Sequence, residues 1–79
     1  MSEVENNDVL VDARRLLCPL PVIRLQQAIK SLPSGSIVRV TATDPGVQND
    51  IPAWCRVHKK TLLSMEQVEN EFIVRVLVP

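Results

Sequence analysis

Two apolar stripes at helical spacing, separated by a run of β-branched residues, limit the folds open to this chain. The first stripe consists of Val22, Leu25, Ile29 and Leu32, at intervals of three and four residues. The second runs through residues 47–58 at similar intervals. This period is typical of amphipathic helices. The β-branched run at residues 37–43 lies between the stripes and favours a strand.

Three further runs have the composition of strands. Residues 9–11 form a short apolar run that ends at Asp12, and residues 61–68 and 72–78 flank a three-residue connection typical of a hairpin. The element order is therefore β-α-β-α-β-β. Two helices can cover only one face of a four-stranded sheet, so the pattern predicts a two-layer α/β sandwich with a mixed sheet. The other face is expected to be partly open to water or to a partner.

Both predicted helices contain or adjoin prolines that affect their limits. The first is expected to begin just after Cys18 and to end before Pro33 and Gly35. In the second, Pro52 interrupts the apolar stripe, and proline is tolerated only in the first turn of a helix. The sequence therefore predicts either a kink or a helix whose regular part starts at Asp50, with Asp50 as its N-cap.

Length and charge restrict the classes of protein that fit. With 79 residues, the chain has room for one domain, predicted at residues 8–79, and residues 1–7 resemble a flexible polar tail. Nine basic residues balance nine acidic ones, which disfavours binding nucleic acid mainly by charge. No apolar segment approaches the roughly 20 residues of a membrane span, and no secretory signal is visible. We therefore expect a cytoplasmic protein with no membrane partner.

The cysteine content excludes several kinds of site. The chain contains two cysteines and one histidine, too few and too far apart for a structural zinc site, and it has no CxxC pair. A disulfide scaffold is also unexpected at this cysteine content. We expect reduced thiols and neither a metal nor a cofactor.

Cys18 is the candidate reactive group. Pro19 and Pro21 occupy the first turn of the predicted helix, where the N–H groups have no partner within the helix, so the prolines lose no hydrogen bonds. Pro19 also favours an extended conformation at Cys18, which places the sulfur at or near the N-cap. The helix dipole and nearby arginines such as Arg14 predict a modest lowering of the pKa of Cys18. Alternatively, Cys18 is only a small capping residue; the Cys-Pro-x-Pro run favours a functional role.

These residues also carry a family resemblance. The run Asp12-Ala13-Arg14-Arg15-Leu16-Leu17-Cys18-Pro19-Leu20-Pro21, followed by Asp44-Pro45 and by Asp50-Ile51-Pro52-Ala53-Trp54-Cys55, resembles the TusA/SirA family of sulfur carriers. The resemblance extends from about Val9 to Val78. It implies a sulfurtransferase-type carrier with a persulfide on Cys18, and it makes Pro19, Pro21, Asp12 and Arg14 the motif and support residues.

The resemblance also implies the partners. A cysteine desulfurase or a rhodanese-type protein would donate sulfane sulfur, and a further protein would accept it. In some members the sulfur goes to 2-thiouridine in tRNA, and in others to sulfur oxidation or molybdenum-cofactor pathways. Because the thiol must be exposed to two partners in turn, we expect a monomer.

One position departs from the family pattern. The family usually has Asp-x-Arg-Gly-Leu before the motif, and this chain has Arg15 in place of that glycine. If the glycine serves a positive φ, Arg15 is strained. If it allows a partner to approach, Arg15 changes the choice of partner.

Two other functional classes remain open. The first is a regulatory or partner-binding module in which Cys18 carries no persulfide. The second is a thiol redox enzyme, which is disfavoured because no resolving cysteine or base accompanies Cys18. Direct RNA binding is disfavoured by the zero net charge and by the small number of aromatic residues.

The other polar and aromatic residues have structural explanations. Cys55 and Trp54 lie on the apolar stripe and are expected in the core. His58 is expected to be partly buried or to lie at the boundary of the core, and Asp44 and Asp50 are expected to cap. The basic cluster Arg56, His58, Lys59 and Lys60 either offsets the helix dipole or binds an acidic partner.

Overall fold

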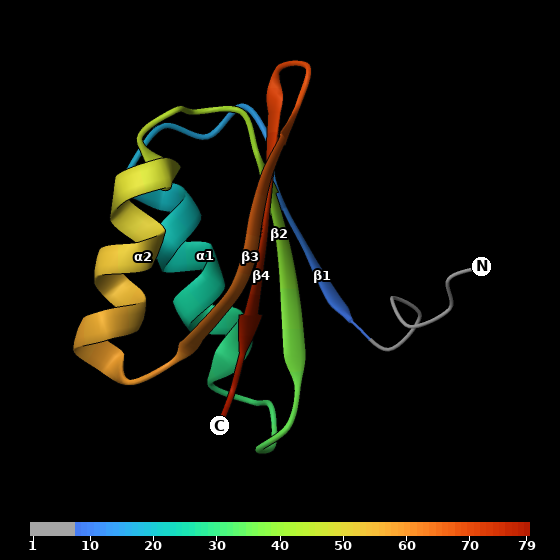
Figure 1. Cartoon of the computed structure of the whole chain (residues 1–79), viewed down its shortest axis with the longest axis vertical. Helices are drawn as coiled ribbons and strands as arrows, with labels where there is room; N and C mark the ends of the chain where they lie inside the picture. Colours follow the sequence, from blue (N-terminus) through green and yellow to red (C-terminus); the bar gives the residue numbers. More distant parts are fainter. Residues whose placement is uncertain (1–7) are drawn as a thin grey trace.

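Four strands form one mixed sheet in the computed structural model, which describes residues 8–79 (Figure 1). The elements are β1 (Val9–Ala13), α1 (Leu20–Ile29), β2 (Ile37–Ala42), α2 (Val47–His58), β3 (Thr61–Val68) and β4 (Glu71–Leu77). The strand order is β1-β2-β4-β3; β1 pairs with β2 in parallel, and the other pairs are antiparallel. The predicted α/β architecture is confirmed. The predicted tail at residues 1–7 lies outside the described residues.

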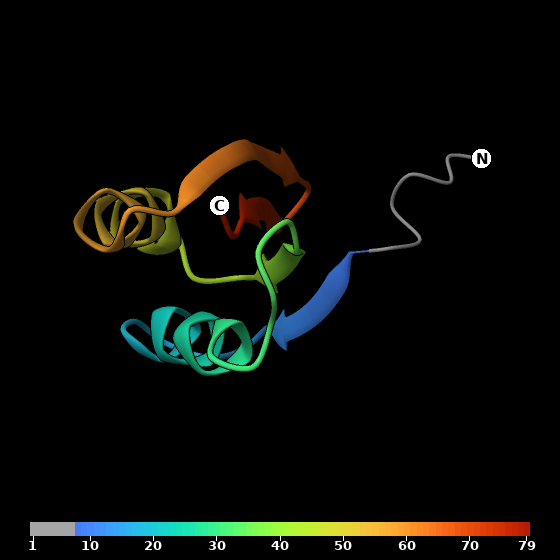
Figure 2. The ribbon, with the colours of Figure 1, turned by 90° about the horizontal axis from the view of Figure 1, so that it is seen from below.

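Both helices pack against the same face of the sheet, so the molecule has two layers (Figure 2). On that face the alternate residues of the two central strands are fully buried, among them Val38, Val40 and Val74. Leu25 from α1 and Ile51 from α2 complete this core without any exposed surface. Within residues 8–79, no helix combines the length and hydropathy needed to cross a membrane.

The opposite face of the sheet carries charged side chains across its centre. The Asp8 carboxylate is almost fully buried there and accepts a 2.9 Å hydrogen bond from Nε of Arg75. Arg39 Nε lies 3.6 Å from the same carboxylate. The sheet face that was expected to be partly open therefore carries ion pairs, which neutralise the charges at its centre.

The start of α2 differs from the prediction. Gly46 is the N-cap and the helix begins at Val47, so Asp50 lies within the first turn and does not cap it. The backbone N–H of Val47 donates to Asp44 O and that of Asp50 to Gly46 O, which continues the preceding turn directly into the helix. Pro52 is therefore inside the helix, where it removes one hydrogen bond near the start.

The turn between β1 and α1 explains the unusual residue at position 15. Leu16 N–H donates to Ala13 O, and Arg15 has a φ of 68°, in the left-handed region. A positive φ at the third position of such a turn favours glycine. Arg15 is held there by its own N–H, which donates to Thr43 Oγ1 at 2.8 Å. The position therefore requires a backbone conformation that a non-glycine residue adopts only at a cost.

We predict that Arg15→Gly stabilises the protein. Glycine removes the steric cost of the positive φ but increases the entropy of the unfolded chain, so we expect a gain of about 0.5–1 kcal/mol in the free energy of unfolding. Urea unfolding measures it. Arg15→Ala is the matched control, because it removes the same side chain and keeps the strained backbone, and it should gain little. Equal gains in both variants would contradict the backbone explanation.

Candidate functional site

Cys18 lies where two loops meet, one before α1 and one before α2. It precedes Pro19, the N-cap of α1, and its N–H donates to Oδ2 of Asp44 at 3.3 Å. Gly46, in the second loop, packs so closely that a Cβ there would lie 2.9 Å from Cys18 Sγ. The prediction that Cys18 lies near the start of α1 is confirmed, and the thiol is partly buried between the loops.

The electrostatic environment of Cys18 differs from the one expected. Burial, and after it the carboxylates of Asp44 and Asp50, together raise the pKa of Cys18 from 9.0 to about 12. The carboxylates act by accepting a hydrogen bond from the thiol and by their negative charge. In return, the Cys18 thiol lowers the pKa of Asp44 by hydrogen bonding to its carboxylate. The predicted lowering of the pKa of Cys18 is therefore wrong, because burial and two nearby carboxylates outweigh the helix dipole. At rest the site holds a protonated thiol beside an ionised aspartate.

Asp44 and Asp50 are the site residues that sequence reasoning missed. Both precede or begin a predicted helix, so capping was the expected role. Asp44 is 26 residues from Cys18 along the chain, and only the pairing of β1 with β2 brings their loops together. The one available signal was the resemblance itself, because both aspartates belong to the segments that carry it.

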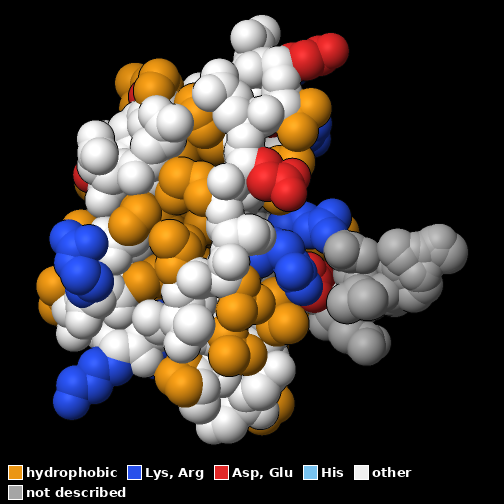
Figure 3. Space-filling view, viewed as in Figure 1, with side chains coloured by type: hydrophobic (Ala, Val, Ile, Leu, Met, Phe, Trp, Pro, Cys, Tyr) orange, Lys and Arg blue, Asp and Glu red, His pale blue; other side chains and the backbone are white. Residues whose placement is uncertain are grey.

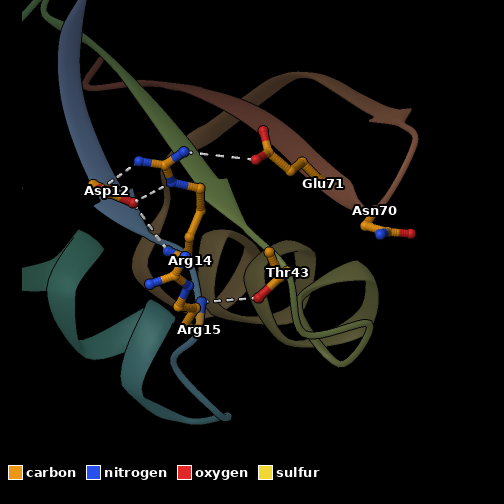
Figure 4. Close-up of a pocket in the computed structure, with 6 residues that line it drawn as sticks. All are labelled: Asp12, Arg14, Arg15, Thr43, Asn70 and Glu71. Atoms are coloured by element: carbon orange, nitrogen blue, oxygen red, sulfur yellow. Dashed lines mark hydrogen bonds and ion pairs between the residues drawn. The ribbon is translucent and has the colours of Figure 1, made fainter.

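Asp12 and Arg14 form a closed pair of their own. Arg14 Nε donates to Asp12 Oδ1 at 2.9 Å and Nη2 donates to Oδ2 at 3.0 Å, and Glu71 lies 3.7 Å from Arg14 Nη1 (Figure 4). Hydrogen bonds from Arg14 lower the pKa of Asp12 to about 2. The pair lines a shallow cavity of about 360 Å³ together with Arg15 and Thr43. No contact found within residues 8–79 joins either member to Cys18, so they support the turn that leads to the thiol.

The second thiol is structural. Cys55 is 3% exposed and faces the core from α2, and burial raises its pKa. Trp54 is partly buried against the core, and its ring centroid lies 4.8 Å from that of His58. The core positions predicted for Cys55 and Trp54 are confirmed. His58 is exposed with its ring against Trp54, so it lies at the boundary of the core and is not partly buried.

Three large apolar side chains next to Cys18 are exposed. Leu17 is 72% exposed, Leu20 46% and Ile23 40%. They lie within five residues of the thiol, around the start of α1. Exposed apolar residues that cluster in this way are typical of protein contact surfaces.

The chain matches one family over nearly its whole length. The family model described as sulfurtransferase TusA matches residues 9–78. The chain belongs to this TusA family. The sulfur carrier protein TusA of Pseudomonas fluorescens is 48% identical over 66 residues, which cover 84% of this chain and 80% of that protein. The putative sulfur carrier protein YrkI of Bacillus subtilis is 39% identical over 69 residues, covering 87% and 89%.

A solved structure shares the TusA-family fold. The crystal structure of a SirA-like protein from Desulfitobacterium hafniense superposes with a TM-score of 0.77 and covers 87% of this chain and 95% of its own. The two sequences are 21% identical, so this likeness shows the common architecture. The resemblance to the TusA/SirA family is therefore confirmed in sequence and in fold.

Proposed function

We propose that the protein accepts sulfane sulfur on Cys18 as a persulfide and passes it to an acceptor protein. The supporting observation is the contrast between the two thiols: Cys18 lies at a loop junction beside exposed apolar residues, and Cys55 is enclosed in the core. The relatives named sulfur carrier support the same role. A cysteine desulfurase or a rhodanese-type protein is the proposed donor. We propose tRNA 2-thiolation as one destination of the sulfur.

The transfer step needs one thiol and no redox partner. Cys18 Sγ attacks the outer sulfur of the donor persulfide, the donor S–S bond breaks, and the donor leaves as a thiolate. The proton of Cys18 ends on that thiolate, so the donor recovers its thiol and the outer sulfur changes carriers without net oxidation. In a second step of the same kind, an acceptor thiol attacks the outer sulfur on Cys18, and the Cys18 thiolate leaves.

The buried position of Cys55 favours a stable loaded state. A thiol near a persulfide attacks it, closes a disulfide and releases sulfide. Because Cys55 is enclosed in the core, it is not positioned for this reaction. Cys18 can therefore hold sulfur until an acceptor arrives.

The test is the intact mass of the protein after incubation with cysteine and a cysteine desulfurase, or with thiosulfate and a rhodanese. We expect a gain of one sulfur atom that a reductant reverses. Fragmentation of the peptides should assign it to Cys18 and leave Cys55 unmodified. No gain with either donor, or a gain on Cys55, would contradict the proposal.

The raised pKa of Cys18 favours a second candidate, a partner-binding module in which Cys18 carries no sulfur. A protonated thiol is a poor nucleophile, so it attacks a donor persulfide slowly. A binding module does not require that attack. The mass experiment separates the two functions.

A further inference from the structure

A groove lies at the end of the molecule opposite to Cys18. Both helices begin at the end where the loops meet and finish at the other end, next to the C-terminus of the chain (Figures 1 and 2). The groove runs between these C-terminal ends and has a volume of about 370 Å³. Since α1 has ten residues, its two ends are about 15 Å apart along the helix axis.

The floor of the groove is apolar and its rim is basic. Ile29, Leu32 and Val78 line the apolar part with the ring of Trp54. Among the polar lining residues are Lys30, Lys60 and His58. None of the lining residues found in the described part of the chain is acidic.

The positive charge continues outside the groove. Arg56 and Lys59 are exposed near the C-terminal end of α2, close in sequence to Lys60. Lys and Arg side chains gather over this end of α2 in the space-filling view (Figure 3). The whole chain has no net charge, so this positive surface is a local feature.

A buried donor at the groove lacks an acceptor. Trp54 Nε1 is buried and has no hydrogen-bond partner. A buried N–H without an acceptor costs free energy, and a ligand that supplies an oxygen removes that cost. Because Trp54 lines the groove, a ligand in the groove would contact its ring.

We propose that this groove binds an acidic segment of a partner protein. An apolar side chain of the segment packs on the floor, and its carboxylates lie against Lys30 and Lys60. A peptide fits better than a small anion because the positive surface extends past the groove to Lys59, which a small anion would not reach. The groove is at the far end of the helices, so a partner held there leaves Cys18 accessible.

Trp54 provides the readout, since it is the only tryptophan in the chain. The probe is a short acetylated peptide of glutamates with one central leucine, titrated while Trp54 emission is recorded. We expect a saturable change in emission that weakens with added salt. The same peptide with glutamines in place of glutamates should not bind. This measurement requires no sulfur on Cys18, so its result is independent of the proposed function.

Charge reversal tests the position of the site. Lys30→Glu and Lys60→Glu should each lower the affinity for the acidic peptide by about fivefold or more, because each turns an attraction into a repulsion. Arg24→Glu makes the same charge change on α1 outside the groove and should alter the affinity by less than about twofold. Circular dichroism checks that all three variants are folded.

Three results would overturn the proposal. The first is the absence of a saturable emission change with the acidic peptide. The second is an equal loss of affinity in Arg24→Glu and the two lysine variants, which would show that only net charge matters. The third is binding of free glutamate as tightly as the peptide, which would assign the groove to small anions.

Discussion

Cys18→Ser is expected to abolish sulfur loading completely and to leave the fold intact. A serine hydroxyl does not form a persulfide, so the variant should show no gain of mass with either donor. The change replaces one atom in a partly buried loop junction outside the core, so the free energy of unfolding should shift by less than about 1 kcal/mol. Intact mass and urea unfolding on the same preparation measure both quantities.

Cys55→Ser is the matched control for this experiment. It makes the same chemical change at the thiol in the core, where the hydroxyl meets apolar neighbours. We expect normal loading and a loss of about 1–3 kcal/mol of stability. An unfolded Cys18→Ser, or a Cys18→Ser that still gains sulfur, would refute the assignment of Cys18.

Removal of the carboxylates beside Cys18 should make the thiol more reactive. Asp44→Asn and Asp50→Asn each remove a negative charge that raises the pKa of Cys18. Each unit by which the pKa falls increases the thiolate fraction at neutral pH about tenfold. We therefore expect iodoacetamide to alkylate the Asp44→Asn variant several times faster than the wild type. Asp50→Asn should act in the same direction.

Asp12→Asn is the control for that series, because Asp12 is also an ionised carboxylate but binds Arg14 and has no contact with the thiol. Its alkylation rate should match that of the wild type. Unchanged rates in both Asp44→Asn and Asp50→Asn would show that the carboxylates do not control the thiol. A rise of the same size in Asp12→Asn would show a general effect of net charge.

The raised pKa of Cys18 also predicts how stability depends on pH. Between pH 9.0 and about 12 the folded state keeps the proton that the unfolded thiol has lost. The stability that this proton contributes is therefore fully present below pH 9.0 and is lost as pH rises through this range. Urea unfolding of the wild type and of Asp44→Asn across the range measures it, and the loss should be smaller in the variant.

The fold could be predicted because it depends on periodicity within short segments. The stripe that begins at Val22 predicts α1, although Leu32 lies beyond the end of the helix at Ile29, and the β-branched run at 37–43 predicts β2. Element order then limits how they pack. The same stripe argument distinguished the two thiols, since Cys55 shares a face with Ile51. The strained backbone at Arg15 was foreseen as one of two alternatives, because a glycine position in a turn has few physical explanations.

The chemistry of the site could not be predicted in the same way. Cys18 was interpreted from its neighbours in sequence, Arg14 and the helix start. In the structure Arg14 binds Asp12, and the thiol faces Asp44 and Asp50 from a distant loop. The sign of a pKa shift depends on burial and on the nearest charges in space, and neither follows from local spacing.

The place of β4 in the sheet has a consequence for synthesis of the protein. β4 follows the other three strands in sequence, yet it lies between β2 and β3 and contributes buried residues such as Val74 and Val76. On the ribosome, the sheet therefore lacks one of its central strands until residues 71–77 have emerged. The loops that hold Cys18 are anchored to β1 and β2, which have no completed sheet to join before then. A nascent chain that lacks β4 therefore lacks the completed sheet on which the loops around Cys18 rest.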